Sequence, residues 1–383
     1  MNITLKRFLA KIISFTSIDN YFLKFRKKIR ERNYFVLREN ILKRKNLDFP
    51  VSITIEPSLR CNLRCFMCYQ SSFRKKYFKQ LKRKELSARE WINFLKKSRG
   101  LIKRIGFTGG EPFIREDIFE IFDCCDKLKI LFNIITNGVL INKEKAKKLQ
   151  KCKFLDGLVV SLHGPKNIHE EITGVKNSFN KVTEALRLIV KKNFWVGINC
   201  VVSERNIEYI DKLVIFCSRI GVDGIGFQLE NFISNRTEEE SLKILKYKNN
   251  NLLHRDDKKG NYKYTLENLL NKIFQVKKIA RKSGIPITFA PSIFYDSPEL
   301  VYYGNARKKF KLLFCEDISS LRIDYQGNVT FCSFFHQSFG NIKNDSLRKI
   351  WNSNKLKEFR YKLISNNLIP ACDRCCKLLT LDS

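Results

Sequence analysis

The chain has 383 residues, 44% of them hydrophobic, and its 73 Lys and Arg against 38 Asp and Glu give a formal net charge of +35. This length accommodates one large domain with a smaller one beside it. The apolar runs near the start are interrupted by Lys11 and fall short of the roughly 20 residues that span a membrane, and no small-residue cleavage site follows them, so neither a transmembrane segment nor a secretory signal is expected.

The positive charge would attract nucleic acid, an anionic membrane or an acidic substrate. The excess is mostly Lys, accompanied by many Asn, Ile and Phe, and compositional drift of the coding sequence is the favoured explanation. We expect a cytoplasmic protein, and neither a nucleic acid nor a membrane surface is the favoured partner.

Residues 1–50 are predicted to form a basic amphipathic extension, because they contain 13 basic and 4 acidic residues. The apolar residues of this segment share one helical face: Leu5, Phe8, Leu9, Ile12 and Ile13. Such a face either lies on an anionic membrane or packs against the rest of the protein, and packing is the commoner outcome.

Short apolar runs then alternate with longer amphipathic ones over residues 51–230, as in repeated βα units with a parallel sheet. The predicted strands are 51–57, 104–109, 130–136, 157–162, 195–202 and 224–229, and the clearest predicted helices are 87–98, 178–192 and 206–220. Ser87 and Glu90 have the spacing of a capping box. The pattern predicts an α/β fold, a partial (β/α)6 barrel of TIM type, with its site at the carboxyl ends of the strands.

The segment 231–310 is predicted to join the barrel to a C-terminal part. Its residues 235–263 are polar and irregular, which indicates a linker, lid or insertion, and a helix at 266–283 completes the barrel. Residues 311–383 are predicted to form a small cysteine-rich domain. It begins with a β-hairpin that turns at Gln326–Asn328 and ends with one helix over 345–364.

Thirteen cysteines in a reducing compartment indicate metal or cluster ligation more than disulfides. Cys61, Cys65 and Cys68 directly follow the first predicted strand. Three thiolates can hold three irons of a four-iron cluster and leave the fourth iron open to a ligand, whereas four thiolates saturate it. A zinc site that takes a fourth ligand from elsewhere in the chain is the alternative.

The C-x3-C-x2-C spacing of these cysteines, followed by Gly-Gly-Glu-Pro at 109–112 after the second strand, resembles the radical S-adenosylmethionine (radical SAM) enzymes. The resemblance implies a 4Fe-4S cluster on the three cysteines and SAM on the open iron. It also implies that Glu111 accepts a hydrogen bond from the SAM ammonium, while Gly109 and Gly110 let the backbone approach the ligand.

Further SAM contacts are implied for residues near the ends of the later strands. Asn137 ends the third strand within Thr-Asn-Gly, and Ser161 ends the fourth, where relatives contact the ribose. Met67 stands where relatives pack against the adenine, and core packing is its alternative role. His163 replaces an Asp that many relatives have.

A second set of cysteines, Cys315, Cys332, Cys372 and Cys375 with Cys376 as a spare, resembles a short SPASM extension together with residues 340–353. Four thiolates fit one fully ligated auxiliary 4Fe-4S cluster, and zinc is the alternative occupant. Spacing alone does not choose between Cys375 and Cys376. The remaining cysteines are predicted to be small buried hydrophobic residues: Cys124, Cys125, Cys152, Cys200 and Cys217.

The resemblance implies an enzyme of oxidoreductase or maturase type that reductively cleaves SAM to a 5'-deoxyadenosyl radical. That radical abstracts hydrogen from an unidentified substrate, which is a small molecule, a sugar or lipid precursor, or a peptide. A one-electron donor such as flavodoxin or ferredoxin is the implied partner. The alternatives are a peptide-modifying SPASM maturase and a non-catalytic iron-sulfur or zinc protein that binds RNA.

Overall fold

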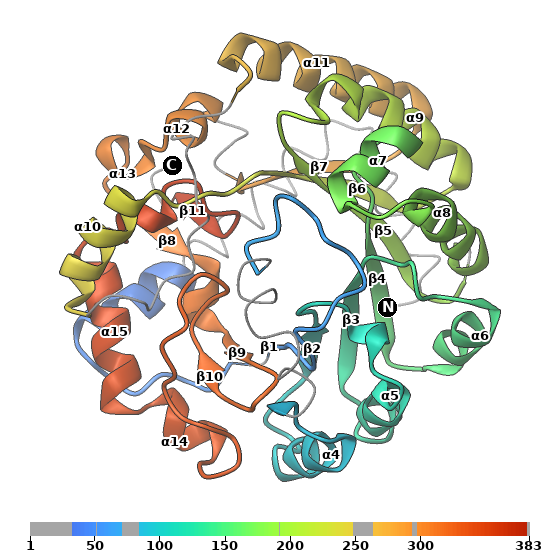
Figure 1. Ribbon diagram of the computed structural model, residues 1–383. Helices are drawn as coiled ribbons and strands as arrows, with labels where there is room; N and C mark the ends of the chain where they lie inside the picture. Colours follow the sequence, from blue (N-terminus) through green and yellow to red (C-terminus); the bar gives the residue numbers. More distant parts are fainter. Residues whose placement is uncertain are drawn as a thin grey trace.

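The computed structural model describes residues 33–50, 52–70, 84–190, 192–247, 263–292 and 297–380. A curved sheet of nine strands, in the order β10-β9-β1-β2-β3-β4-β5-β6-β7, forms its centre, and helices cover the outside (Figure 1). The strands are β1 (Ser52–Ile55), β2 (Arg104–Phe107), β3 (Leu131–Thr136), β4 (Leu155–Ser161), β5 (Trp195–Val202), β6 (Gly224–Leu229), β7 (Ile287–Ala290), β9 (Leu321–Ile323) and β10 (Val329–Thr330).

The sheet confirms the predicted α/β partial barrel and extends it at both edges. All six predicted strands are present, and neighbours from β9 to β7 pair in parallel. The strand β7 was not predicted and adds to one edge. The predicted hairpin is the antiparallel pair β9–β10, and β9 joins β1 in parallel at the other edge. Within the described residues no pairing connects β7 to β10, so the sheet remains open.

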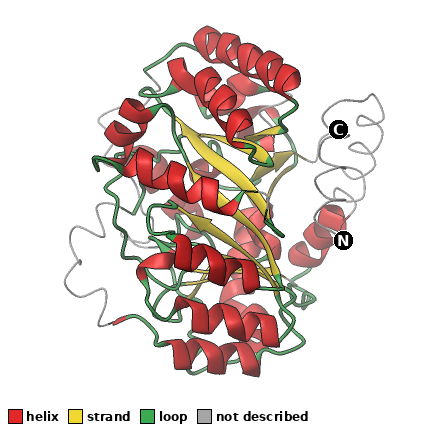
Figure 2. Cartoon of the chain, turned by 90° about the vertical axis from the view of Figure 1, so that its right-hand side faces the viewer, coloured by secondary structure: helices red, strands yellow, loops and turns green. Residues whose placement is uncertain are grey.

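The outer helices arise from amphipathic segments between the strands. In α4 the apolar Trp91, Phe94 and Leu95 face the core, and both hydrogen bonds of the predicted Ser87–Glu90 capping box form. Figure 2 shows the helices stacked outside the strands. They are α4 (Ala88–Lys97), α5 (Ile118–Lys127), α6 (Lys143–Lys151), α7 (Lys166–Thr173), α8 (Ser178–Ile189), α9 (Ile210–Ile220) and α11 (Leu266–Ser283), with shorter α12 (Pro298–Tyr303) and α13 (Ala306–Lys309).

Two predictions of local structure were wrong. The polar segment predicted to be irregular contains the helix α10 (Asn235–Leu245), because Ser234 caps its start and Leu242 and Leu245 bury one face. The single helix predicted over 345–364 is two helices, α14 (Leu347–Trp351) and α15 (Asn354–Ser365). Ser353 starts a new helix because its side chain accepts a hydrogen bond from the backbone of Leu356.

Residues 33–50 pack against the C-terminal part of the chain. They are helical at 33–42, and the Trp351 indole donates hydrogen bonds to the carbonyls of Leu47 and Asp48. The ring of Tyr34 lies 4.5 Å from that of Phe314, beside the strand pair β8 (Leu313–Cys315) and β11 (Leu378–Thr380). The predicted apolar face from Leu5 to Ile13 lies outside the described residues.

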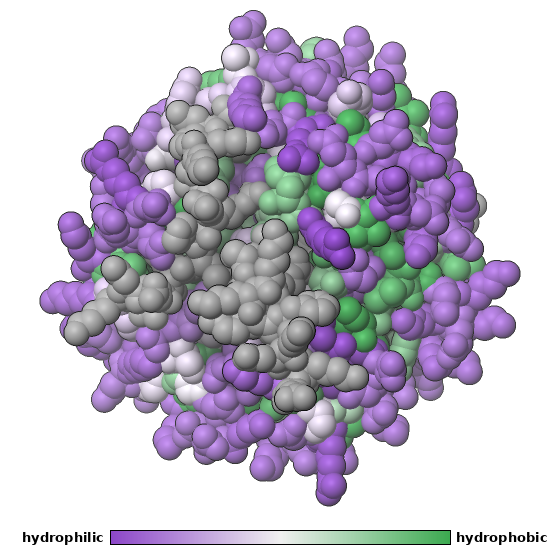
Figure 3. All heavy atoms as spheres, viewed as in Figure 1, coloured by the Kyte–Doolittle hydropathy of each residue, from purple (hydrophilic) through white to green (hydrophobic). Residues whose placement is uncertain are grey.

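Charged and polar side chains dominate the rim of the face viewed in Figure 3, and apolar side chains gather closer to its centre. No helix in the described ranges has both the length and the apolar character needed to span a bilayer.

Candidate active site

The loop that follows β1 carries the three predicted cluster ligands. Cys61, Cys65 and Cys68 are all partly exposed. The backbone amides of Arg64 and Phe66 donate hydrogen bonds of 2.9 and 3.1 Å to the carbonyls of Thr173 and Ile172 at the end of α7. The loop is thus held at the carboxyl end of the sheet, where parallel α/β folds place their sites.

The Gly-Gly turn after β2 packs directly on this loop. The amide of Gly110 donates to the carbonyl of Ser58, and the amide of Glu111 donates to that of Arg60, both at 2.8 Å. A Cβ on Gly110 would lie 2.2 Å from the Arg60 carbonyl oxygen, and one on Gly109, whose φ is +111°, would lie 2.4 Å from that of Ser58. In this structure the two glycines therefore permit a close approach between two loops of the protein, whereas the expected approach was to a ligand.

The carboxylate of Glu111 is fully buried and joins the ends of β2 and β3. It accepts hydrogen bonds from the Thr136 hydroxyl at 2.7 Å, the Asn137 amide at 2.8 Å and the Phe113 amide at 3.1 Å. Burial raises the pKa of Glu111, and these donors oppose that rise. The predicted contact with the SAM ammonium stays a prediction, while the observed partners give the carboxylate a structural role.

Asn137 connects the end of β3 to the first cysteine. Its side-chain amide donates to Asn62 at 2.9 Å and lies 3.7 Å from the Cys61 sulfur, which also accepts from the amide of Leu63 at 3.4 Å. N–H groups directed at a sulfur stabilise its thiolate, which is the form that binds iron. The surroundings of Cys61 therefore fit a cluster ligand.

The other predicted SAM contacts lie on the same side of the sheet. Ser161 is the last residue of β4, and Met67 is partly exposed within the cysteine loop. Next to Ser161, His163 and His169 stack at 5.7 Å, and burial lowers their pKa values to about 3 and about 4. His169 is fully buried and lies in the core.

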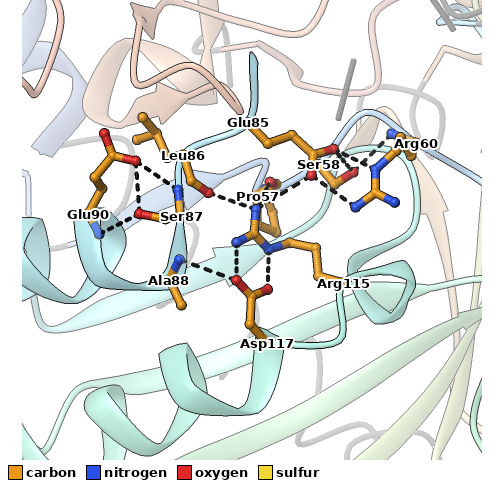
Figure 4. Close-up of polar contacts among 10 residues, drawn as sticks. All are labelled: Pro57, Ser58, Arg60, Glu85, Leu86, Ser87, Ala88, Glu90, Arg115 and Asp117. Atoms are coloured by element: carbon orange, nitrogen blue, oxygen red, sulfur yellow. Dashed lines mark hydrogen bonds and ion pairs between the residues drawn. The ribbon is translucent and has the colours of Figure 1, made fainter. Parts of the chain in front are cut away.

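A polar network that the sequence did not reveal holds residues 57–60, which lead into Cys61 (Figure 4). Glu85 accepts two hydrogen bonds from Arg60, at 2.9 and 3.0 Å, and one from the Ser58 hydroxyl. The Arg115 guanidinium donates to the carbonyls of Pro57 and Leu86, as Figure 4 also shows.

Asp117 completes this network through its ion pair with Arg115 at 2.7 Å and lines a polar cavity of about 320 Å³ together with its neighbours. The contact of Arg60 with Glu85 spans 25 residues of the chain and that of Arg115 with Pro57 spans 58, so no local pattern indicates them. The network fixes the backbone that leads into Cys61.

The second set of cysteines also gathers in the structure. Cys315 ends β8, Cys332 follows β10, and Cys372 and Cys375 lie before β11. Burial raises the pKa of Cys332 to about 12, with further contributions from Asp317 and Cys372, and the pKa of Cys315 rises for the same reasons with Cys372 and Cys332 as neighbours. The pairing of β8 with β11 sets Cys315 opposite Leu378, whose amide donates to the Cys375 carbonyl, and the Cys375 amide donates to the Cys372 carbonyl, both at 3.0 Å.

Cys375 resembles Cys61 in its local geometry. Its sulfur accepts a hydrogen bond of 3.4 Å from the amide of Lys377, two residues onward, as the Cys61 sulfur does from Leu63. The Cys375 and Cys376 thiols act most strongly on each other, which raises the pKa of Cys375 and lowers that of Cys376, and Cys315 and Cys372 also raise the pKa of Cys375.

The described part of the chain has no three His, Cys, Asp or Glu side chains close enough to hold a single metal ion. The remaining five cysteines are buried, as predicted, and burial raises the pKa of Cys152 to about 12.

An open parallel α/β barrel with a three-thiol loop at its mouth and a second thiol set in a C-terminal extension defines a class of iron-sulfur barrel proteins. The chain matches the radical SAM superfamily over residues 55–217 and the SPASM iron-sulfur cluster-binding domain over residues 315–376. It belongs to the radical SAM superfamily and ends in a SPASM domain. Radical SAM domains bind a 4Fe-4S cluster and SAM, and SPASM domains bind auxiliary iron-sulfur clusters.

Solved structures with the same fold include SuiB of Streptococcus suis. It is 20% identical, with a TM-score of 0.62 over 87% of this chain and 74% of that one. The structure of SuiB bound to the precursor peptide SuiA is 21% identical, with a TM-score of 0.60 over 83% of this chain and 68% of that one. The structure of anSMEcpe with bound AdoMet and the Cp18Cys peptide is 20% identical, with a TM-score of 0.57 over 82% of this chain and 83% of that one. At these identities the likeness establishes the fold alone.

Proposed function

We propose that this chain is a radical SAM enzyme in which Cys61, Cys65 and Cys68 hold the SAM-binding cluster. In this proposal Cys315, Cys332, Cys372 and Cys375 hold one auxiliary cluster. The observation that carries it is the position of Cys61, whose sulfur receives N–H groups from Leu63 and Asn137 at the carboxyl end of the sheet. The choice of Cys375 over Cys376 is supported by the Lys377 amide that donates to its sulfur.

The bound cluster and SAM supply a one-electron reductive cleavage that yields methionine and a 5'-deoxyadenosyl radical, which takes a hydrogen atom from the substrate. The residues of this chain position these groups. Glu111 and Asn137 hold the ends of β2 and β3 against the loop of Cys61, and Glu85 holds the same loop from outside. Gly109, Gly110, Met67 and Ser161 line the side of the barrel where SAM is proposed to lie.

The proposed substrate is a peptide, and the reaction is a modification at an unactivated C–H bond. Two observations support this choice over a small molecule. SuiB and anSMEcpe share the fold and have been solved with peptides bound, and the net charge of +35 favours an acidic peptide. The same charge favours an acidic one-electron donor such as flavodoxin or ferredoxin.

Deuterium transfer tests the substrate class. The reconstituted protein is incubated without oxygen with SAM, dithionite and either a pooled library of deuterated acidic peptides or a pool of deuterated sugars. We expect deuterium in 5'-deoxyadenosine, measured by mass spectrometry, from the peptide pool only. Deuterium from the sugar pool alone would overturn the peptide assignment, and the absence of 5'-deoxyadenosine in both arms would overturn SAM cleavage itself.

A further inference from the structure

A buried ion pair lies between the two thiol sites. The strand β9 is flanked by β1, which leads into the loop of Cys61, and by β10, which leads to Cys332. Arg322 is the middle residue of β9 and stands opposite Thr54 of β1 and Thr330 of β10. A side chain on this strand is therefore between the segments that carry the two sets of thiols.

The partner of Arg322 is Glu56, the first residue after β1. The Arg322 nitrogen lies 2.6 Å from the Glu56 oxygen, and the two side chains are only 14% and 8% exposed. Removing two charges from water is costly, and each charge of such a pair needs the other. The pair is thus neutral as a whole, but it has a positive end and a negative end.

The surroundings of the pair connect the two sites. Tyr69, next to Cys68, packs its ring 5.2 Å from that of Phe334, two residues after Cys332. Arg322 stands directly opposite Thr330, and Cys332 follows Thr330 by two residues, so the positions of Arg322 and Cys332 lie on the same face of the hairpin. A cation at Arg322 is therefore on the side of the hairpin that leads to Cys332, where its charge acts on a cluster bound to that sulfur.

We propose that Glu56 is a positioning residue that cancels the charge of Arg322 and thereby holds down the reduction potential of the auxiliary cluster on Cys332. Reduction adds one negative charge to a cluster, so an uncompensated cation nearby favours the reduced form and raises the potential. The pair keeps the guanidinium in place without its full electrostatic effect. This inference rests on the proposed function, because it requires an auxiliary cluster at Cys332.

A redox titration of the reconstituted full-length protein tests the inference. Dithionite supplies one electron to each cluster, converting [4Fe-4S]2+ to [4Fe-4S]1+, and EPR measures the reduced form at each potential. The auxiliary signal is the one that added SAM leaves unchanged. In Glu56→Gln we expect the redox equilibrium of the auxiliary cluster to shift at least tenfold toward the reduced form. This corresponds to a reduction potential higher by about 59 mV for one electron. In Glu56→Gln/Arg322→Gln we expect the potential to return to that of the unchanged protein.

Asp156→Asn is the matched control, because Arg104 and Asp156 form an ion pair with the same 2.6 Å separation at the amino ends of β2 and β4, the opposite end of the sheet from the cysteine loop. It should leave the potential unchanged. A Glu56→Gln protein with no upward shift would overturn the inference. So would a shift that persists in the double variant, because the cause would then be altered packing.

The iron content of the reconstituted protein distinguishes a failure of the proposed function from a failure of the role proposed for the ion pair. If the unchanged protein lacks auxiliary iron, the proposed function is wrong in its second cluster. If it contains that iron and Glu56→Gln does not shift the potential, only the role of the ion pair is wrong.

Discussion

Some residues at the mouth of the barrel can be predicted from a local sequence pattern, and others cannot. The cysteine loop is predictable because ligands of one cluster that lie on one loop must have short, fixed spacings. Arg322 and Glu56 meet across 266 residues, and no pattern in the sequence connects them. A charged residue directly after an apolar strand, as Glu56 is, was the only available sign.

Asn137 offers a test of the N–H groups around Cys61. Asn137→Ala removes the donor to Asn62 and the contact with the Cys61 sulfur. Loss of such support costs roughly 10- to 100-fold in metal affinity or activity, so we expect a decrease of that order in the rate of 5'-deoxyadenosine formation and faster loss of iron to a chelator. Asn142→Ala, which removes the N-cap of α6, should reduce stability by about 1 kcal/mol and leave iron retention unchanged.

His163 and His169 make the folded state sensitive to acid. Their pKa values are lowered by burial to about 3 and about 4, below the usual 6.5. The unfolded chain therefore binds more protons than the folded protein below pH 6.5. The free energy of unfolding is highest above pH 6.5 and decreases as the pH falls toward 4, by about 1.4 kcal/mol per pH unit for each histidine. Urea unfolding at pH 6.5, 5.5 and 4.5 should show a smaller loss for His163→Gln. An identical loss in both proteins would refute this explanation.

At the scale of elements, loops at the strand ends fix the site more than the strands themselves do. Gly-Gly-Glu-Pro was predicted to contact a ligand, and in the structure its glycines contact the backbone of 58–60. The motif was visible in the sequence but its partner was not, because a close approach between two loops depends on the strand register of β1 and β2. The helix α10 was missed because its exposed face is strongly polar.

Gly110→Ala tests the close approach of these loops. Its Cβ would overlap the carbonyls of Arg60 and Leu59, so the loop of Cys61 must move. We expect a loss of about 1–3 kcal/mol in stability from overpacking, together with a lower iron content. Gly106→Ala, in the strand β2 that precedes this turn, is the control, because the nearest atom to its Cβ would be an ordinary 3.6 Å away. Equal effects of the two substitutions in thermal unfolding would contradict the account.

At the scale of the whole molecule, the sheet joins segments that the sequence presents separately. Six strands were predictable because each is an apolar run before an amphipathic helix. The parallel pairing of β9 with β1 was not, since residues 53 and 321 leave no joint signal. This pairing places the SPASM domain directly beside the radical SAM site.

The number of irons tests this two-site architecture. The ligand sets predict two four-iron clusters, or about eight irons per chain after reconstitution. Metal analysis of Cys332→Ala should give about four, because one auxiliary ligand is lost. Four irons with one zinc in the unchanged protein would instead identify zinc at the second site.

The cleavage of SAM by the Cys65→Ala protein is the most direct test of the open coordination site on which the proposed chemistry depends. Cys152→Ala serves as the control, because Cys152 is buried in the core away from both thiol sets. With SAM and dithionite in the absence of oxygen, we expect 5'-deoxyadenosine from the unchanged protein and from Cys152→Ala, and none from Cys65→Ala. Continued formation of 5'-deoxyadenosine by Cys65→Ala would contradict the assignment of the cluster to this loop.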